Sequence, residues 1–516
     1  MRSLKKLLSV IIVMVLAVSC LSACGSKGKK KAGNSTTDIE IKVWNSGLGT
    51  DWLDAVIKGF EAKYPEYNVT YSSTASNTAV MAAFDNEEVD TIDLYLSQVQ
   101  YDATSLEPLD DVLDSVADGD TKTIREKLNP SYAELEIYPD GKTYSLTWGG
   151  GSLGLVYNKK LFDEAGVRNI PRTTDELAST CDTLAGADIV PTVHYKGAQY
   201  WDYMQDAWFV QYDGADYVKN NFYGCTDLNG NSPSKEVFVA EDGRYESLKA
   251  FEKILTFDYV LTGSNSQSHI VSQTMFLQEE AAMMVNGSWL TNEMESVGSM
   301  DDYAVMKTPV LSAITKKLTT VKKEMDLRKV ITAIDAVVDG DADIATYKDG
   351  ENYNVDGLSV SAADWDYIYS ARHTVPANYS GQTMFIPKYS NAKEGAKEFI
   401  KYMYSDEGYK IYADTLHAAL PLSLCDGEID TTEWNNFEKQ MYNLLDNSEQ
   451  IASGYIKDQH DIFLFGGAEK YAGVKFISQF CAGNESDRRN AASAWEDILK
   501  QVDKKYEGTW LKNISE

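Results

Sequence analysis

The sequence is poor in the residue types that many metal and redox sites use. Its 516 residues include only five histidines and six cysteines, and these are scattered along the chain. It contains no H-E-x-x-H and no C-x-x-C pair, so we expect neither a bound metal nor a cofactor. Basic residues are also few, 48 against 78 acidic ones, which gives a formal net charge of −30. A chain this acidic repels phosphates, which argues against nucleic acid as a partner.

Long apolar runs are lacking beyond the N-terminus, and the run found there is short. Three basic residues precede an apolar stretch at 7–18, which is shorter than the roughly 20 residues that span a bilayer. The following Leu-Ser-Ala-Cys at 21–24 resembles a bacterial lipobox. We therefore predict a signal peptide over 1–23, with a lipid on Cys24 that holds the protein on the outer face of the cytoplasmic membrane. A plain secretory signal is the alternative.

The Gly/Ser/Lys-rich stretch 24–37 is predicted to be a flexible tether. Four cysteines remain beyond it, and export permits disulfides between them. Their spacing leaves two bridges, one bridge or four buried thiols open. They are Cys181, Cys225, Cys425 and Cys481.

The chain after the tether alternates between strand and helix patterns. Apolar and polar residues alternate at 39–44, and a helical apolar face follows from about residue 50. Further strands are predicted from residue 69 and at 92–96, with a helical run near 80–84 between them. This order predicts an α/β lobe with a mostly parallel sheet. Ligands meet such sheets at the carboxyl ends of strands. The residues at those ends are Trp44, Asn45, Ser97 and Gln98.

A glycine-rich segment at 149–154 contains the pattern Gly-x-Ser-x-Gly. In hydrolases the serine of this pattern lies at a sharp turn where the chain passes from a strand into a helix. Here Ser152 is followed by a strand-like run. We therefore expect no catalytic residue here. The glycines instead suggest a strand that crosses between two lobes, with Trp148 at the crossing.

The run at 281–289 predicts a short buried strand that ends in Asn286-Gly287, with Trp289 just after the turn. An amide beside a flat ring suits a polar, ring-shaped ligand, and burial of the ring in the core is the alternative. In the aromatic-rich helix expected at about 201–210, we favour Trp201 as a second ligand contact and Trp208 as core. Residues 308–310 are predicted to cross back to the first lobe.

Four segments, taken together and in order, resemble family 1 extracellular solute-binding proteins, the capture subunits of ABC importers. They lie at 41–65, 156–177, 281–289 and 386–400, so the likeness spans about 38–410. The resemblance implies a fold like that of maltose-binding protein: a type II periplasmic-binding-protein-like α/β fold of two lobes joined by crossing hinge strands. We accordingly predict one lobe from 38–147 with 309–415 and the other from 148–308 with 416–516.

The resemblance also implies a function, namely capture of a carbohydrate, expected to be an oligosaccharide, and its delivery by a monomer to a membrane permease. The positions that match ligand contacts of the family are Trp289, Ser97, Gln98 and the region of Trp201. The chain departs from the family in its length, mainly at 210–245 and 312–375. It also has Gly151 where an acidic side chain is often found.

Two other functions remain open. A surface glycoside hydrolase needs two carboxylates that face each other across a cleft. Asp202 and Asp206 are four residues apart and share one helix face, so they do not meet that requirement. A binding lipoprotein for a peptide, a polyamine or another non-sugar solute is the second alternative.

Overall fold

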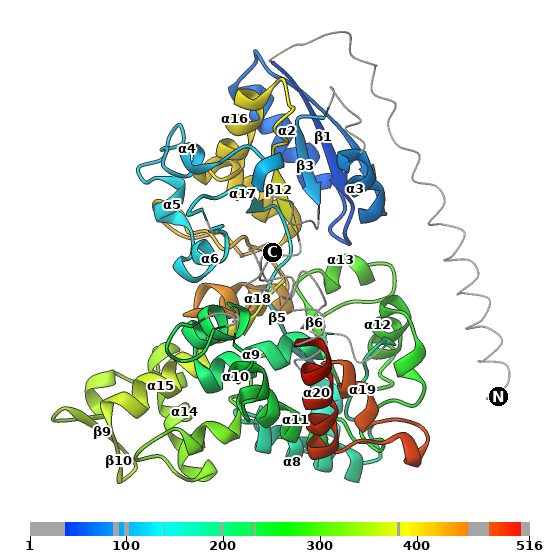
Figure 1. Cartoon of the computed structure of the whole chain (residues 1–516), viewed down its shortest axis with the longest axis vertical. Helices are drawn as coiled ribbons and strands as arrows, with labels where there is room; N and C mark the ends of the chain where they lie inside the picture. The colour runs from blue at the N-terminus through cyan, green and yellow to red at the C-terminus, as the bar shows by residue number, and fades with distance from the viewer. Residues whose placement is uncertain are drawn as a thin grey trace.

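The chain folds into two lobes, drawn at the top and the bottom of Figure 1, and it passes between them more than once. The computed structural model describes residues 37–85, 92–97, 103–138, 140–196, 200–224, 226–231, 234–378, 382–452 and 474–506. The predicted signal peptide, the lipidation site Cys24 and nearly all of the tether lie outside these residues, as do Gln98 and Cys225. No helix within the described ranges has the length and apolarity needed to cross a bilayer.

The first lobe is built on a five-stranded sheet with the strand order β2-β1-β3-β12-β4. Strand β1 pairs in parallel with β2 and β3, as predicted, whereas β12 runs antiparallel to β3 and β4. Strand β1 alternates buried and partly exposed residues, which places Ile39, Ile41 and Val43 in the core. The strands are β1 (Asp38–Trp44), β2 (Asn68–Thr74), β3 (Leu94–Ser97), β4 (Leu146–Thr147) and β12 (Thr383–Phe385).

Helices from distant parts of the chain cover this sheet. Helix α2 (Asp51–Lys63) buries one apolar face that includes Val56 and Phe60, and α17 (Asp406–Leu416) packs against it. Each buried side chain of this kind contributes about 1.5–3 kcal/mol relative to exposure. The other helices of the lobe are α3 (Asn77–Asp85), α4 (Asp110–Leu113), α5 (Ile124–Lys127), α6 (Pro130–Leu135) and α16 (Lys393–Met403).

The second lobe contains a three-stranded antiparallel sheet with the order β6-β5-β7. These strands are β5 (Leu153–Asn158), β6 (Met283–Gly287) and β7 (Tyr303–Met306). The glycine-rich segment thus leads into a strand, as predicted, and Gly154 pairs with Asn286. Thr173 caps the helix at Thr174–Gly186, because its hydroxyl accepts the Glu176 N–H at 3.2 Å.

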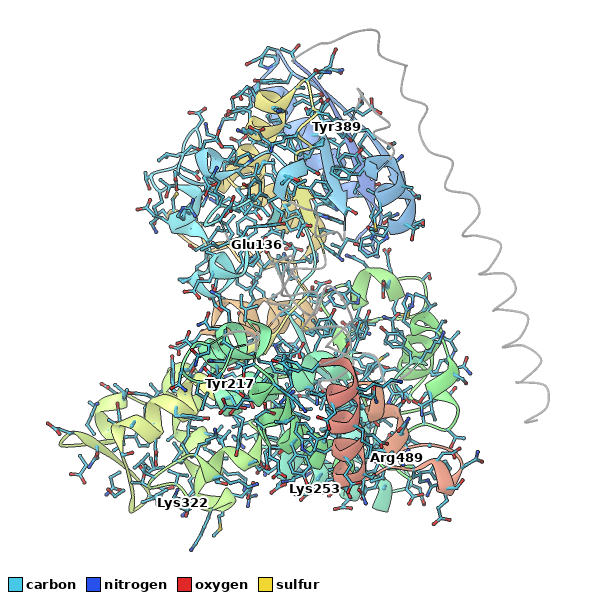
Figure 2. All side chains as sticks on the ribbon, viewed as in Figure 1. Glu136, Tyr217, Lys253, Lys322, Tyr389 and Arg489 are labelled. Carbon is cyan, nitrogen blue, oxygen red and sulfur yellow. The ribbon has the colours of Figure 1, made fainter. Side chains whose placement is uncertain are left out.

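Many helices surround the second sheet, and the side chains between them form two hydrophobic clusters (Figure 2). The helices are α7 (Lys159–Glu164), α8 (Thr174–Gly186), α9 (Trp201–Asp213), α10 (Glu236–Val239), α11 (Gly243–Ile254), α12 (His269–Leu277), α13 (Leu290–Met294), α18 (Asn436–Asp446), α19 (Val474–Phe480) and α20 (Ala491–Lys505).

The segment 309–375 belongs to the second lobe, which corrects the predicted lobe boundaries. Val310 forms a bridge with Thr173, so the chain does not cross at 308–310. Helix α14 (Glu324–Val338) buries Leu327, Val330 and Ile331 in the second-lobe core. The segment also contributes α14 (Glu324–Val338), β8 (Lys348–Asp349), β9 (Asn352–Val355), β10 (Leu358–Val360) and α15 (Ala362–Arg372).

The chain returns to the first lobe after β11 (Thr374–Pro376), which pairs in parallel with β13 (Gln450–Ala452). Ala377 lies in the first-lobe core, and so do buried residues between 416 and 434, which the prediction placed in the second lobe. The chain enters the second lobe again at α18, where Phe437 and Met441 pack against strand residues such as Val156. The lobe boundaries follow from which apolar faces meet in one core, and local sequence patterns do not specify that.

Candidate functional site

The two lobes meet where the loop after β1 approaches the turn after β6. Gly47 in this loop has φ +81°, and a Cβ added to it would lie 2.5 Å from Glu293 Oε1 on α13. On the crossing segment, a Cβ on Gly151 would overlap Ser288. We call this region the lobe junction. It comprises residues 46–48, 149–152, Tyr200, 288–293 and Gln382.

An aromatic cluster lies at the lobe junction, and its Trp289 ring packs in the first-lobe core. The Trp289 ring lies 5.8 Å from that of Tyr200, which in turn contacts Tyr195 at 4.9 Å and Tyr203 at 6.1 Å. Tyr200 packs against the cores of both lobes. It also has φ 74°, an uncommon value for a residue other than glycine, and such strain is concentrated at functional sites. This cluster offers ring faces of the kind that pack against the C–H faces of sugars.

Buried polar atoms surround these rings. The hydroxyls of Ser46, Ser288 and Thr291 have no hydrogen-bond partner among the described residues, and neither has Oε1 of Gln382, whose side chain lies against Gly149. A buried polar group without a partner costs about 1–3 kcal/mol, so such groups are rare outside functional sites. A bound molecule with hydroxyl groups would satisfy them.

A carboxylate completes the lobe junction. Glu293 accepts a hydrogen bond from Gln273 Nε2 at 2.7 Å, and Oε1 of Gln273 is another buried atom that lacks a partner in the described structure. Burial raises the pKa of Glu293, and the Gln273 hydrogen bond opposes that shift. Burial also raises the pKa of Tyr200 to about 12, helped by the charge of Glu293, so its phenol is protonated at neutral pH. The lobe junction can therefore both donate and accept hydrogen bonds.

One predicted site residue, Trp289, lies at the lobe junction, and another, Trp148, directly precedes its segment 149–152. Trp289 is only 4% exposed and packs against Tyr200. Trp148, on the crossing segment, is fully buried and stacks on Trp52 at 5.6 Å with an interplanar angle of 15°. Its indole Nε1 is buried with no partner in the described structure. Ligand contact for both rings remains a prediction.

The residues at the strand ends of the first lobe are more varied. Trp44 is partly buried at the end of β1, and Asn45 is exposed, with its backbone N–H donating to Thr74 O at 2.8 Å. Ser97 is fully buried and donates to Asn77 Oδ1 at 2.7 Å, so its hydroxyl already has a partner.

The structure gives two predicted residues a different place from the one expected. Trp201 has no exposed surface and lies in the second-lobe core, edge-on to Phe251 at 5.9 Å. Asn286 is also fully buried, and its Oδ1 accepts the N–H of Gly287 at 2.8 Å. Its amide thus shapes the turn that carries Trp289. The positions of the Trp201 and Asn286 side chains do not support direct ligand contact.

Sequence reasoning missed Tyr200, Glu293, Gln273 and Gln382. Tyr200 lies in the aromatic-rich run, directly before Trp201, which was the predicted ligand contact. The start of α9 directs the Trp201 side chain into the core. Glu293 lies four residues after Trp289, one helical turn further on. That spacing could have identified Glu293 as a candidate from the sequence. Nothing in the sequence indicates that Glu293 contacts the opposite lobe.

The structure supports the rejection of a serine nucleophile. The Ser152 hydroxyl donates to Met441 O at 3.0 Å, and it precedes a strand rather than a helix. None of its hydrogen bonds within the described residues involves a base that would activate it.

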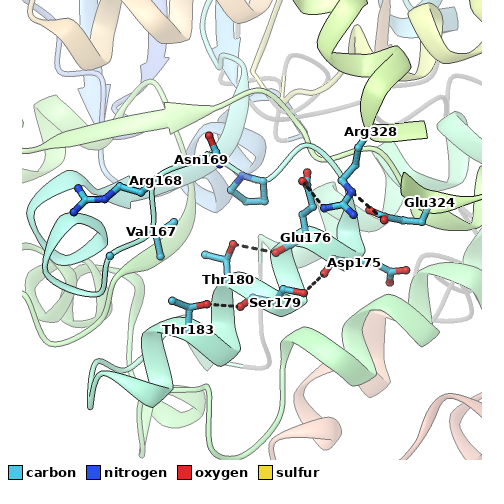
Figure 3. A pocket seen from close by; sticks show the side chains of 12 residues that line it. Val167, Arg168, Asn169, Asp175, Glu176, Ser179, Thr180, Thr183, Glu324 and Arg328 are labelled. Carbon is cyan, nitrogen blue, oxygen red and sulfur yellow. Dashed lines mark hydrogen bonds and ion pairs between the residues drawn. The ribbon is translucent and has the colours of Figure 1, made fainter. Parts of the chain in front are cut away.

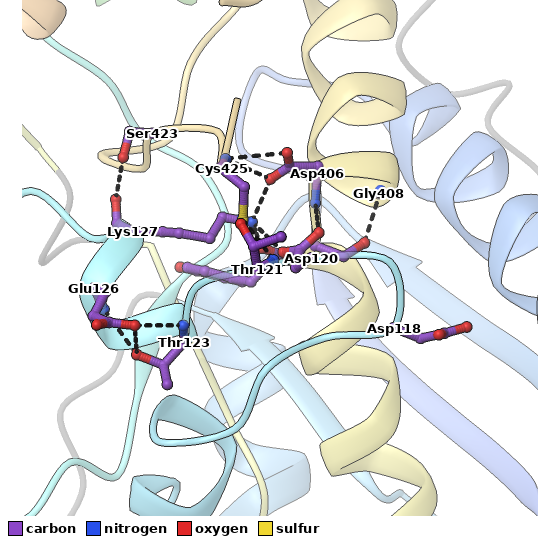
Figure 4. A network of polar contacts seen from close by, with 12 residues as sticks. Asp118, Asp120, Thr121, Thr123, Glu126, Lys127, Asp406, Gly408, Ser423 and Cys425 are labelled. Carbon is purple, nitrogen blue, oxygen red and sulfur yellow. Dashed lines mark hydrogen bonds and ion pairs between the residues drawn. The ribbon is translucent and has the colours of Figure 1, made fainter. Parts of the chain in front are cut away.

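One cluster has the residue types of a metal site, but an ammonium group fills it (Figure 4). Asp120, Asp406 and Cys425 lie close together. Lys127 is fully buried, and its Nζ is 2.6 Å from an Asp120 oxygen and 2.7 Å from an Asp406 oxygen. It also donates to Tyr404 O at 2.8 Å. Since the lysine ammonium lies between the two carboxylates and bonds to both, the cluster is an ion-pair network rather than a metal site.

A cavity of about 400 Å³ lies on the second lobe, away from the lobe junction (Figure 3). The hydroxyls of Ser179, Thr180 and Thr183 in its wall donate to carbonyls of their own helix. Arg328 there is paired with Glu176 at 3.2 Å and Glu324 at 3.0 Å. Several of its polar groups thus have partners within the protein, and it is a weaker candidate site than the lobe junction.

The described cysteines are unpaired. Cys181, Cys425 and Cys481 are free thiols, of which the first and last are buried. Burial raises the pKa of the Cys481 thiol, which keeps it protonated and unreactive.

Comparison with known proteins places this geometry in context. A family model described as "Bacterial extracellular solute-binding protein" matches residues 46–410. A putative binding protein of Brucella abortus is 27% identical over 203 residues, which cover 39% of this chain and 44% of that protein. The diacetylchitobiose-binding protein DasA of Streptomyces coelicolor is 24% identical over 232 residues, covering 42% of this chain and 52% of DasA. The chain thus spans about half the length of the curated relatives it matches.

Solved structures show the same fold. The bacterial solute receptor AcbH, described as having an exclusive preference for β-D-galactopyranose, matches with a TM-score of 0.60 at 14% identity. The match covers 91% of this chain and 99% of AcbH. The predicted fold, two α/β lobes of the type II binding-protein class, is thereby confirmed.

Proposed function

Because this chain belongs to the family of bacterial extracellular solute-binding proteins, we propose that it captures a carbohydrate at the lobe junction and delivers it to an ABC permease. The observation that carries the proposal is the lobe junction itself, where the rings of Trp289 and Tyr200 lie among buried polar atoms without partners. Stacking area and unused hydrogen-bonding groups together match the C–H faces and hydroxyl edges of a sugar. DasA and AcbH, which bind sugars by their descriptions, support the same class of ligand.

Capture would use the two lobes as a hinged pair. Residues of the first-lobe loop and of α13 already approach each other, and the crossing segments connect the lobes on one side. A sugar that bonds to both lobes stabilises the closed arrangement by its differential affinity for it. We expect an oligosaccharide, since the aromatic cluster of Tyr195, Tyr200, Tyr203 and Trp289 extends beyond one ring.

Attachment to the membrane completes the proposal. A lipid on Cys24 and the tether 24–37 would hold the binding domain, as a monomer, at the outer face of the cytoplasmic membrane beside its permease. No chemical step is proposed, because a binding protein must release its ligand unchanged.

The test is a titration of tryptophan fluorescence against a panel of oligosaccharides. One sugar should shift the emission and remain intact. Trp289→Ala should weaken its binding by about 1–3 kcal/mol, the value of burying and stacking one large ring. Trp365→Ala is a matched control, since it removes an equally buried ring that stacks on Tyr353 in the second lobe, 4.2 Å away. An unchanged affinity in Trp289→Ala would remove this ring from the site.

The same titration separates the alternatives. Released reducing ends would identify a glycoside hydrolase. A response to peptides or polyamines, with none to sugars, would identify a receptor for a non-sugar solute.

A further inference from the structure

Glu293 is a partly buried carboxylate at the lobe junction that has no lysine or arginine partner among the described residues. Its Oε2 accepts a hydrogen bond from Gln273 Nε2 at 2.7 Å. Its Oε1 forms no hydrogen bond within the described ranges and faces the first-lobe loop, where a Cβ on Gly47 would lie 2.5 Å from it. The basic group whose charge acts on Glu293 is the exposed imidazole of His269. A carboxylate withdrawn from water is stabilised by a cation, which a ligand could supply.

The unpartnered polar atoms around Glu293 are mainly acceptors. Gln273 is fully buried, and because its Nε2 donates to the carboxylate, the amide atom left without a partner in the described structure is the oxygen Oε1. Oε1 of Gln382 is a second buried acceptor of this kind. The hydroxyls of Ser46, Ser288 and Thr291 can accept as well as donate. An ammonium group has three donors and no acceptor, so it matches this set of atoms.

The aromatic cluster lies in a negative field. Tyr195, Tyr200 and Tyr203 are each only partly buried, so their rings keep some accessible surface. Burial raises the pKa of all three phenols, and the carboxylate of Asp202 adds to each shift. Glu293 adds to the shift in the pKa of Tyr200 as well. The face of an aromatic ring attracts a cation within about 6 Å, so the rings and the carboxylates favour the same kind of ligand group.

We propose that the lobe junction selects a ligand that carries a protonated amino group, and that Glu293 determines this specificity. The ammonium group would donate to Glu293 Oε1 and to the neighbouring oxygen acceptors, and it would lie against the ring of Tyr200. An amino group on a sugar ring and the end of a polyamine present the same chemistry, and the experiment separates these two sources. This specificity rests on the proposed function only in that the ligand binds at the lobe junction.

The test is isothermal titration calorimetry of the full chain with matched ligands, at a pH where the amines are protonated. Short β-linked glucosamine oligomers carry ammonium groups, whereas N-acetylglucosamine oligomers of the same length are neutral. Putrescine carries ammonium groups without a sugar ring. The charged form of the preferred ligand should bind at least about tenfold more tightly than its neutral counterpart, because it forms a charge pair with a carboxylate that is partly withdrawn from water.

Two variants assign the preference to Glu293. Glu293→Gln keeps the size of the side chain but removes its charge, so it should weaken binding of the amine at least about tenfold and leave the affinity for the neutral counterpart unchanged. Glu295→Gln makes the same change on an exposed residue just after α13 and should leave both affinities unchanged.

The outcomes separate this specificity from the proposed function. Equal binding of the N-acetylated and the amino oligomers would overturn the specificity and leave sugar capture intact. Binding of putrescine without any oligosaccharide, lost in Glu293→Gln, would support the specificity and contradict carbohydrate capture. No binding of any amine, or an unchanged preference for the amine in Glu293→Gln, would overturn the specificity.

Discussion

Substitution of Gly47 tests the contact between the two lobes. Its φ of +81° is left-handed, and a Cβ there would meet Glu293 Oε1 at 2.5 Å. Gly49, two residues later, has φ +69° and nothing within 4 Å of an added Cβ. Alanine at either position carries the same backbone penalty, about 1–2 kcal/mol. Only Gly47→Ala must also displace the Glu293 side chain.

The displacement of the Glu293 side chain determines how much more Gly47→Ala should destabilise the protein than Gly49→Ala. Forcing a side chain off its preferred rotamer costs about 0.5–1.5 kcal/mol. Gly47→Ala should therefore lower the free energy of unfolding by about 1.5–3.5 kcal/mol, and Gly49→Ala by about 1–2 kcal/mol. Gly47→Ala should also weaken sugar binding, because the added methyl group holds the lobes apart. Gly49→Ala should leave the affinity unchanged.

Urea unfolding of a double-mutant cycle checks the reasoning. In a Glu293→Ala background the side chain that obstructs Cβ is gone, so Gly47→Ala should cost no more than Gly49→Ala. The coupling energy between Gly47 and Glu293 should then be about 0.5–1.5 kcal/mol. Equal costs for the two glycine variants, with no coupling to Glu293, would refute the contact between the lobes.

Three further predictions concern stability and attachment. Arg372→Met leaves the Asp335 carboxylate buried without its main partner and should cost about 3–5 kcal/mol in urea unfolding; Lys253→Met, which breaks an exposed pair, should have little effect. Burial lowers the pKa of His194 to about 4. The unfolded chain therefore binds this proton more readily, and stability should fall by about 3 kcal/mol as the pH drops from 6.5 to 4. The His194→Gln variant should lose less stability over the same pH range. An equal loss of stability would exclude His194 as the cause. Cys24→Ser should move the protein from the membrane fraction to the medium, whereas continued membrane retention would contradict lipidation.

Local elements were predictable because each one is encoded by its own periodicity. The alternation at 39–44 specified β1, and the apolar face from Leu53 to Phe60 specified α2. The run after Ser152 identified a strand and so excluded a nucleophile elbow. These patterns, in order along the chain, also sufficed to identify the family.

The candidate site was only partly predictable. Trp289 comes just after a buried strand that its own sequence specifies, and the structure places it at the lobe junction. The predicted Asn286-Gly287 turn was wrong, because both residues pair within that strand. Trp201 and Tyr200 are adjacent in sequence, yet one lies in the core and the other between the lobes. Aromatic composition does not distinguish them, because the start of α9 decides which ring turns inward.

The sequence by itself determined the type and order of many local elements, the family, and the buried strand that leads to Trp289. Only the tertiary structure decided that 309–375 packs with the second lobe and that Glu293 meets Gly47. The physical reason is that periodicity shows which face of an element is apolar but not which distant face will cover it. That choice depends on the mutual fit of side chains far apart in the chain, and it exists only once the cores have formed.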